Sequence, residues 1–169
     1  AQSVGRVVSY ARSRGMSKFA ALVPAGVYGE RAGTAMLRAV EQAGGTVIAM
    51  ESFQRSPGSL TAAIRKLPAG YDAVLIADGG RIALQAAPIV RQNGGADARI
   101  LGTELWNTEE STIVATNALR GAWFASVPDS YYRQLTTKYR ARFNAAPYRL
   151  SALGYDAVLL TVRIAQNWK

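Results

Sequence analysis

The chain has 169 residues, carries a net charge of +9 and contains neither Cys nor His. Those two absences exclude a Cys nucleophile, a Ser-His-Asp triad, a Cys/His zinc site and a haem histidine. Hydrophobic residues make up 49% of the sequence, which is enough for a folded core. No stretch of the sequence approaches the ~20 consecutive apolar residues that cross a bilayer.

Short apolar runs alternate with amphipathic segments over the first 125 residues. We predict strands at residues 18–24, 46–53, 72–77, 99–103 and 121–125. We predict helices at residues 4–15, 28–43, 60–67, 82–92 and 111–119, with Ser59 as the cap of the third. This alternation predicts an α/β fold: a Rossmann-like parallel sheet of about five strands with helices on both faces.

The alternation stops after residue 125, where Pro128 ends the last strand and two helices follow at 131–144 and 151–168. We predict an α/β lobe of the ligand-binding type over residues 1–127. Residues 128–169 are predicted to be a helical pair that belongs to a second, otherwise missing lobe. The second helix is apolar around most of its circumference, so we expect it to be buried in a homodimer. Folding back onto its own sheet is the alternative.

Basic and aromatic side chains are interleaved in the helical pair, for example Lys138, Tyr139 and Arg140. Such a mixture can bind nucleic acid. However, Leu135, Tyr139 and Phe143 recur at helical spacing, which is typical of the core face of an amphipathic helix. We therefore favour a solvated basic face and predict no nucleic-acid partner.

Three loops that follow predicted strands carry polar and aromatic residues, and the carboxyl ends of parallel strands share one edge of a sheet. The candidate ligand-binding residues are Tyr28, Asp78, Gly79, Gly80, Glu104 and Trp106. Carboxylates accept hydrogen bonds from an ammonium, free N–H groups at Gly79 and Gly80 attract an anion, and rings cover an apolar group. Convergence on one edge favours a site for a small polar ligand.

Each of these candidates also has a purely structural interpretation. Tyr28 can simply pack at a helix start, Asp78-Gly79-Gly80 can be a cap and turn, and Glu104 can be a solvated carboxylate. The phosphate-binding and nucleophile-elbow motifs are absent from the sequence. Asp78 and Glu104 lack a third residue to complete a magnesium or acid–base site. We therefore predict no catalysis, no metal and no cofactor.

The order of motifs resembles the C-terminal lobe of type I periplasmic binding proteins over essentially the whole chain. The motifs are Val-Tyr-Gly-Glu at 27–30, Gly-Gly-Thr-Val at 44–47, Tyr-Asp-Ala-Val-Leu-Ile at 71–76, Leu-Gly-Thr at 101–103 and Gly-Ala-Trp-Phe at 121–124. They are most similar to receptors of ABC transporters of the leucine/isoleucine/valine-binding type. Residues 78–80, 101–106 and 121–124 look especially like a related branch, the penicillin-binding protein activators.

The resemblance implies a two-lobed protein that closes on a small ligand by hinge motion, of which this chain is a fragment. It implies that Tyr28 covers the ligand's side chain and that Glu104 helps to hold its ammonium. The missing lobe would supply a Ser/Thr clamp, so we expect this lobe alone to bind amino acids weakly. Gly79 stands where amino-acid receptors place a second aromatic residue, which favours the activator-like branch or a different ligand.

The function implied is that of a non-enzymatic periplasmic receptor lobe, which binds an amino acid or a similar solute and delivers it to the membrane permease of an ABC transporter. The alternative is an activator-like regulator of cell-wall synthesis that contacts a cell-wall synthase. A carboxylate-based enzyme is a third and weaker hypothesis. The location implied is the periplasm, with a lipid anchor on the full-length protein left open. If the site is retained, Tyr28 and Glu104 should lie partly exposed at one edge of the sheet.

Overall fold

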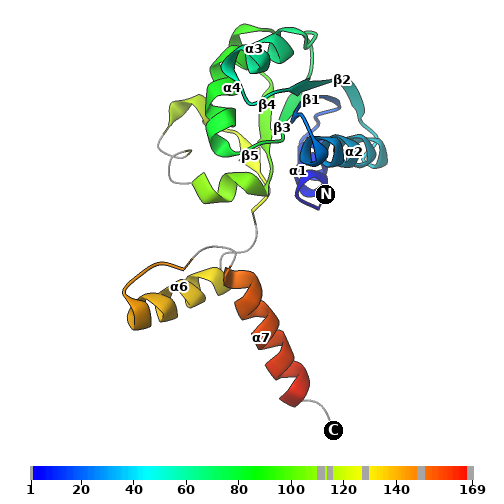
Figure 1. The fold of residues 1–169 in the computed structure, drawn as a ribbon. Helices are drawn as coiled ribbons and strands as arrows, with labels where there is room; N and C mark the ends of the chain where they lie inside the picture. Colours follow the sequence, from blue (N-terminus) through cyan, green and yellow to red (C-terminus); the bar gives the residue numbers. More distant parts are fainter. Residues whose placement is uncertain (1, 110–112, 114–115, 127–129, 148–150, 167–169) are drawn as a thin grey trace. The chain divides into compact units, whose positions relative to one another are not determined.

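The computed structural model describes residues 2–109, 113, 116–126, 130–147 and 151–166. The chain divides into two compact units, Ala1–Ser126 and Val127–Lys169, which are described separately below. Figure 1 shows the chain as a ribbon with its elements labelled. The assignment of the second unit to another lobe stays a prediction.

The first unit contains one five-stranded sheet. Its strands are β1 (Lys18–Pro24), β2 (Thr46–Phe53), β3 (Ala73–Ile76), β4 (Arg99–Gly102) and β5 (Trp123–Phe124). All neighbouring strands are parallel, in the order β2-β1-β3-β4-β5. The predicted α/β class is therefore confirmed. The chain leaves β1 toward β2 and returns to β3 on the other side, so the strand order reverses at β1 and β3, where ligands of such sheets bind.

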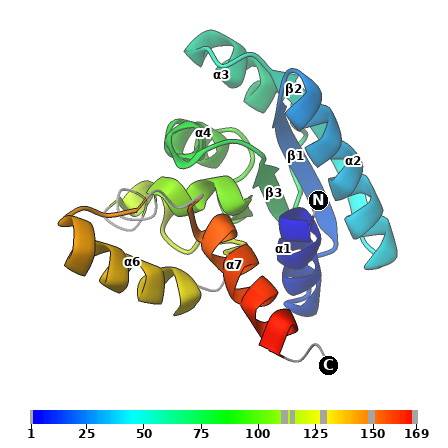
Figure 2. The same ribbon diagram turned by 60° about the horizontal axis from the view of Figure 1, so that its bottom comes forward.

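Helices cover both faces of this sheet, as Figures 1 and 2 show. The elements are α1 (Gln2–Ser13), α2 (Val27–Gln42), α3 (Pro57–Arg65) and α4 (Gly80–Gln92), followed by the 3-10 helices η1 (Glu104–Glu109) and η2 (Asn117–Leu119). The helix predicted at 111–119 includes positions outside the described residues, and its last three residues form η2. The loop expected after β4 is instead η1, which the sequence analysis missed.

The central strand contributes side chains to two separate cores. Phe19, Ala21 and Val23 pack with α1 and α2 on one face. Ala20 and Leu22 pack with α3 and α4 on the other face. Successive residues of a strand point to opposite faces, so a strand covered on both sides must be apolar at every position. This is why β1 appears in the sequence as an unbroken apolar run.

The predicted cap of α3 is wrong by three residues. The helix begins at Pro57 with Ser56 as its N-cap, because proline favours the first helical turn. Ser59 lies inside the helix, and its Oγ accepts a hydrogen bond from the Gln54 N–H at 2.9 Å. This bond fastens the segment between β2 and α3, which carries Arg55, to the helix that follows.

The second unit consists of α6 (Ser130–Phe143) and α7 (Ser151–Gln166). Asn144 ends α6 with φ of 48°, and the Tyr132 hydroxyl donates to the Pro147 carbonyl at 3.0 Å. The core face expected on α6 is present only in part, because Leu135 is buried whereas Phe143 is 57% exposed. In the described part of α7, large apolar side chains are exposed at Val158, Leu160, Val162 and Ile164. Among the described residues, no helix has the length and apolar character of a membrane span.

Candidate ligand-binding edge

Tyr28 is held at the carboxyl end of β1 by a tight strand-to-helix turn. Gly26 adopts a φ of 103°, which glycine tolerates far better than other residues, and α2 begins at the next residue. Gly29 packs so closely on β1 that a Cβ at this position would lie 1.7 Å from the Pro24 carbonyl oxygen. The turn leaves the Tyr28 side chain 37% exposed.

The Tyr28 hydroxyl lies 3.2 Å from Thr103 Oγ1, which follows β4. This hydrogen bond joins the ends of β1 and β4 across β3. Burial raises the pKa of the Tyr28 phenol, and the nearby carboxylates of Glu104 and Asp78 raise it further. The phenol is therefore a neutral hydrogen-bonding group at neutral pH, with two negative charges nearby.

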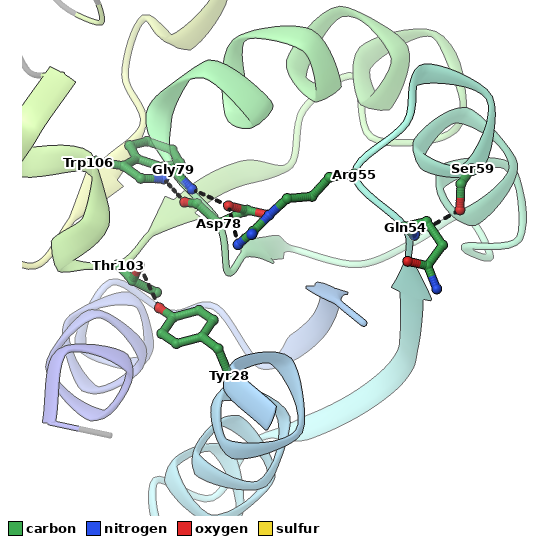
Figure 3. Close-up of polar contacts among 8 residues, drawn as sticks. All are labelled: Tyr28, Gln54, Arg55, Ser59, Asp78, Gly79, Thr103 and Trp106. Atoms are coloured by element: carbon green, nitrogen blue, oxygen red, sulfur yellow. Dashed lines mark hydrogen bonds and ion pairs between the residues drawn. The ribbon is translucent and has the colours of Figure 1, made fainter. Parts of the chain in front are cut away.

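Asp78 follows β3 and forms an ion pair with Arg55, which follows β2. Arg55 Nε lies 2.8 Å from Asp78 Oδ2, and Arg55 Nη2 lies 3.2 Å from Asp78 Oδ1 (Figure 3). The Asp78 side chain is 7% exposed, whereas the Arg55 side chain is 62% exposed. Asp78 was expected to receive a ligand's ammonium, but both of its oxygens already accept hydrogen bonds from Arg55.

The N–H groups of the glycine pair are not all open to a ligand. The Gly79 N–H donates to Asp78 Oδ1 at 2.8 Å, so the expectation of a free N–H at Gly79 is wrong. Gly79 is the N-cap of α4, and Gly80 is its buried first residue. The Gly79 N–H therefore fits the interpretation of residues 78–80 as a cap and turn. A direct contact of either glycine with a ligand stays a prediction.

Trp106 lies inside the core rather than on the ligand-facing surface. Its side chain is fully buried, and its indole Nε1 donates to the Asp78 backbone carbonyl at 2.9 Å. A Cβ at Gly102 would lie 2.4 Å from the indole ring, so the absence of a side chain there makes room for it. Trp106 therefore positions the loop that carries Asp78, and its fully buried side chain offers no surface to a ligand.

Glu104 begins η1 and is half-buried at the same edge as Tyr28. Its Oε2 atom is buried and has no hydrogen-bond partner among the described residues. Buried polar atoms are nearly always paired, so this carboxylate oxygen is unusual among the described residues. Tyr28 and Glu104 thus lie partly exposed at one edge of the sheet. Their contact with a ligand stays a prediction.

A family described as periplasmic binding protein matches residues 1–168. The chain belongs to the periplasmic binding protein family. A search of curated proteins found no match. The comparison with solved structures found several that share the fold, and each of those reported below is longer than this chain.

Three solved structures illustrate the similarity of this periplasmic binding protein chain to known folds. An extracellular ligand-binding receptor from Rhodopseudomonas palustris HaA2 is 24% identical, with a TM-score of 0.64 over 86% of this chain and 44% of that one. A branched-chain amino acid ABC transporter periplasmic ligand-binding protein from Burkholderia xenovorans LB400 is 19% identical, with a TM-score of 0.64 over 92% and 44%. An ABC transporter substrate-binding protein from Desulfitobacterium hafniense, solved with Leu, is 17% identical, with a TM-score of 0.60 over 98% and 49%. The chain thus spans less than half the length of each.

Two residues of this edge escaped the sequence analysis, Arg55 and Thr103. Arg55 follows the second strand, whose loop was not considered, although every strand of a parallel sheet ends at the same edge. The predicted strand at 99–103 ends on Thr103, whereas β4 ends at Gly102 and the Thr103 hydroxyl faces Tyr28. Both residues could have been found from their position, because each lies one or two residues beyond the end of a strand.

A cavity of about 420 Å³ lies elsewhere, between α1 and β5. Its lining is Arg6, Val7, Tyr10 and residues 122–126, and includes none of the strand-end residues described above. Across the described part of the chain, no group of three acidic residues is placed to hold a metal ion. The cavity is therefore separate from the group of polar side chains at the carboxyl edge.

Proposed function

We propose that this periplasmic binding protein chain forms one ligand-binding face of a receptor for a small polar solute such as an amino acid. The observation that carries the proposal is the gathering of Tyr28, Glu104 and the Arg55–Asp78 pair at the strand ends where the sheet order reverses. Such strand ends are where α/β sheets bind ligands.

The groups at this edge suit binding better than catalysis. The exposed part of the Tyr28 ring can cover an apolar part of the ligand, and the half-buried Glu104 carboxylate can accept a hydrogen bond from its ammonium. Asp78 has its oxygens occupied by Arg55 and Gly79, so it is poorly suited to act as a general base. We propose that the chain binds its solute without transforming it.

The partners and location follow from the family. We propose that the whole protein works in the periplasm, with or without a lipid anchor, and that it delivers its solute to the permease of an ABC transporter. The structures similar to this chain are described as ligand-binding receptors and transporter proteins, which does not favour the cell-wall activator alternative. We propose a homodimer for this chain in isolation, because the described part of α7 exposes large apolar side chains such as Leu160 and Ile164.

The test is a titration of the isotope-labelled chain with leucine, followed by NMR. We expect millimolar leucine to shift the amide signals of residues 25–28, 54–55, 78–80 and 103–105. Signals at the opposite edge, such as those of Ser17 and Gly45, should not move. Shifts confined to the cavity beside Tyr10, or no shifts, would contradict the proposal. Calorimetry that gave micromolar affinity would contradict the need for a second lobe, because one face leaves the charged groups of a zwitterion in water.

A further inference from the structure

Arg55 and Asp78 connect two strand ends that are not neighbours in the sheet. Arg55 lies two residues beyond β2, and Asp78 lies two residues beyond β3, with β1 between these strands. The ion pair therefore crosses the end of β1 at the place where the strand order reverses, as Figure 3 shows. This is the same edge that carries Tyr28 and Glu104.

The pair is asymmetric in its exposure. The carboxylate is 7% exposed, whereas the guanidinium is on a side chain that is 62% exposed. An arginine has five N–H donors, and Asp78 engages two of them, on Nε and Nη2. Within the described part of the chain, the other donors of Arg55 have no acceptor. Asp78 therefore fixes the plane of the Arg55 guanidinium, and the remaining N–H donors can bind a second acceptor.

The guanidinium is also held firmly enough to be preorganised. Asp78 is itself oriented by the Gly79 N–H, and the Trp106 indole holds the Asp78 carbonyl. The segment that carries Arg55 is fastened by the bond between Gln54 and Ser59. A planar, oriented guanidinium matches the geometry of a carboxylate, and its prior fixation lowers the entropy lost on binding.

The charged side chains at this edge lie at different strand ends, with Arg55 after β2, Asp78 after β3 and Glu104 after β4. Helices α2, α3 and α4 all begin here, and helix N-termini favour negative charge. The Asp78 carboxylate is buried and the Arg55 guanidinium is exposed, so the β2 side of the edge presents the guanidinium end of this ion pair to solvent. Glu104 follows β4 on the other side and carries an unpaired oxygen. Tyr28 lies under the influence of all three charged groups, which shift the pKa of its phenol in opposite directions.

We propose that Arg55 is a specificity-determining residue that binds an anionic group of the solute, so that this receptor takes ligands with a carboxylate facing this lobe. The cationic or hydrogen-donating part of the same ligand lies toward Glu104. This inference rests on the proposed function of the edge and narrows its ligand class. A neutral side chain at that position of the ligand leaves water as the acceptor for those N–H donors of Arg55 that Asp78 does not engage.

The test compares glutarate with glutaramide, a neutral molecule of the same size, by NMR titration of the isotope-labelled chain. The readouts are the Arg55 Nε–H signal and the amide signals of Gln54, Arg55 and Gly79. Because a hydrogen bond to a charged group is worth about tenfold in affinity or more, we expect glutarate to bind at least about tenfold more tightly than glutaramide. The variant Arg55→Gln should lose this preference, and Arg55→Lys should keep only part of it.

Two further variants make the result decisive. Arg38→Gln removes the same charge from an exposed position of α2 and should leave the preference for glutarate intact. Arg55→Gln leaves Asp78 unpaired, so the double variant Arg55→Gln/Asp78→Asn is measured beside it to separate loss of binding from loss of folding. A folded single or double variant that still prefers glutarate would overturn the inference.

The outcomes also separate the inference from the function on which it rests. If leucine shifts signals at this edge but glutarate shows no advantage over glutaramide, the role of Arg55 is wrong and the proposed function stands. If neither leucine, glutarate nor glutaramide moves any signal at the edge, both the role of Arg55 and the proposed function are wrong.

Discussion

The hydroxyl groups of Tyr28 and Thr103 lie 3.2 Å apart, and they join the turn after β1 to the end of β4. The two strands are separated by β3, so this bond reaches across the end of the strand that Asp78 follows. The contact fixes the direction in which the Tyr28 ring points and leaves the side chain partly exposed. A ring held in this way can cover a ligand without first losing side-chain freedom.

We predict that Tyr28 ionises at higher pH than an exposed tyrosine. Burial and the charges of Glu104 and Asp78 raise the pKa of its phenol above the ordinary value of about 10. The resulting contribution to stability is fully present below the unfolded pKa and is lost as the pH rises through the folded pKa. Ultraviolet titration of the wild type against Tyr28→Phe measures it. A phenol that ionises at or below the ordinary value would contradict the described surroundings.

We predict that Gly29→Ala destabilises the first unit by roughly 3 kcal/mol, because its Cβ would collide with the Pro24 backbone. The matched control is Gly58→Ala in α3, where no atom outside the chain neighbours and the backbone of that helix turn lies within 4 Å of the added methyl group. That change should be neutral or stabilising by up to about 1 kcal/mol. Urea unfolding of both variants measures the difference, and equal stabilities would disprove the tight turn at Tyr28.

We predict that Asp72 stabilises the fold in a pH-dependent way. Its Oδ2 accepts the backbone N–H groups of Ser17 and Lys18 at 2.7 and 2.8 Å, and these bonds lower the pKa of the carboxyl. The stabilisation is present above the unfolded pKa of about 3.9 and is lost as the pH falls through the lower folded pKa.

Asp72→Asn should therefore cost about 1–2 kcal/mol at pH 7 and remove that part of the acid dependence. Unfolding experiments between pH 2 and 7 measure both effects. Asp97→Asn, which removes a charge from an exposed loop residue, should change the stability at pH 7 little. An acid dependence that is the same in Asp72→Asn and in the wild type would contradict the role of Asp72.

We predict that the isolated chain self-associates at micromolar concentration through α7. Leu160 and Ile164 are 60% and 50% exposed, and burying such side chains contributes roughly 1.5–3 kcal/mol each. Leu160→Ser combined with Ile164→Ser should give a monomer in sedimentation experiments, whereas Leu37→Ser on α2 should not. A wild-type chain that sediments as a monomer would rule out the homodimer.

The strands could be predicted from the sequence because their apolar runs are bounded by turn residues. β1 and β2 match their predicted bounds, and β5 is shorter than predicted because only Trp123 and Phe124 pair with β4. The capping of α3 could not be predicted from Ser59 alone, because Pro57 starts the helix one residue after Ser56.

The site was harder to predict than the fold. The sequence predicts that Trp106 faces a ligand, but it is buried. A six-residue 3-10 helix is too short for its sequence pattern to show which side is buried. Its burial depends on the space left by Gly102, four residues away. The pairing of Arg55 with Asp78 depends on the strand order β2-β1-β3, and the hydrophobic periodicity of the sequence gives no information about strand order. Tyr28 and Glu104 could be placed at one edge because each lies within four residues of the end of a strand.

The most direct test of the central claim is to detect contacts between bound leucine and the Tyr28 ring by intermolecular nuclear Overhauser effects on the isotope-labelled chain. The account predicts contacts from the ligand's methyl groups to the Tyr28 ring, and their loss in Tyr28→Ala but not in Leu37→Ala, which alters an exposed residue of the same helix. Contacts to Tyr10 and Trp123, in the cavity between α1 and β5, with none to Tyr28, would contradict it.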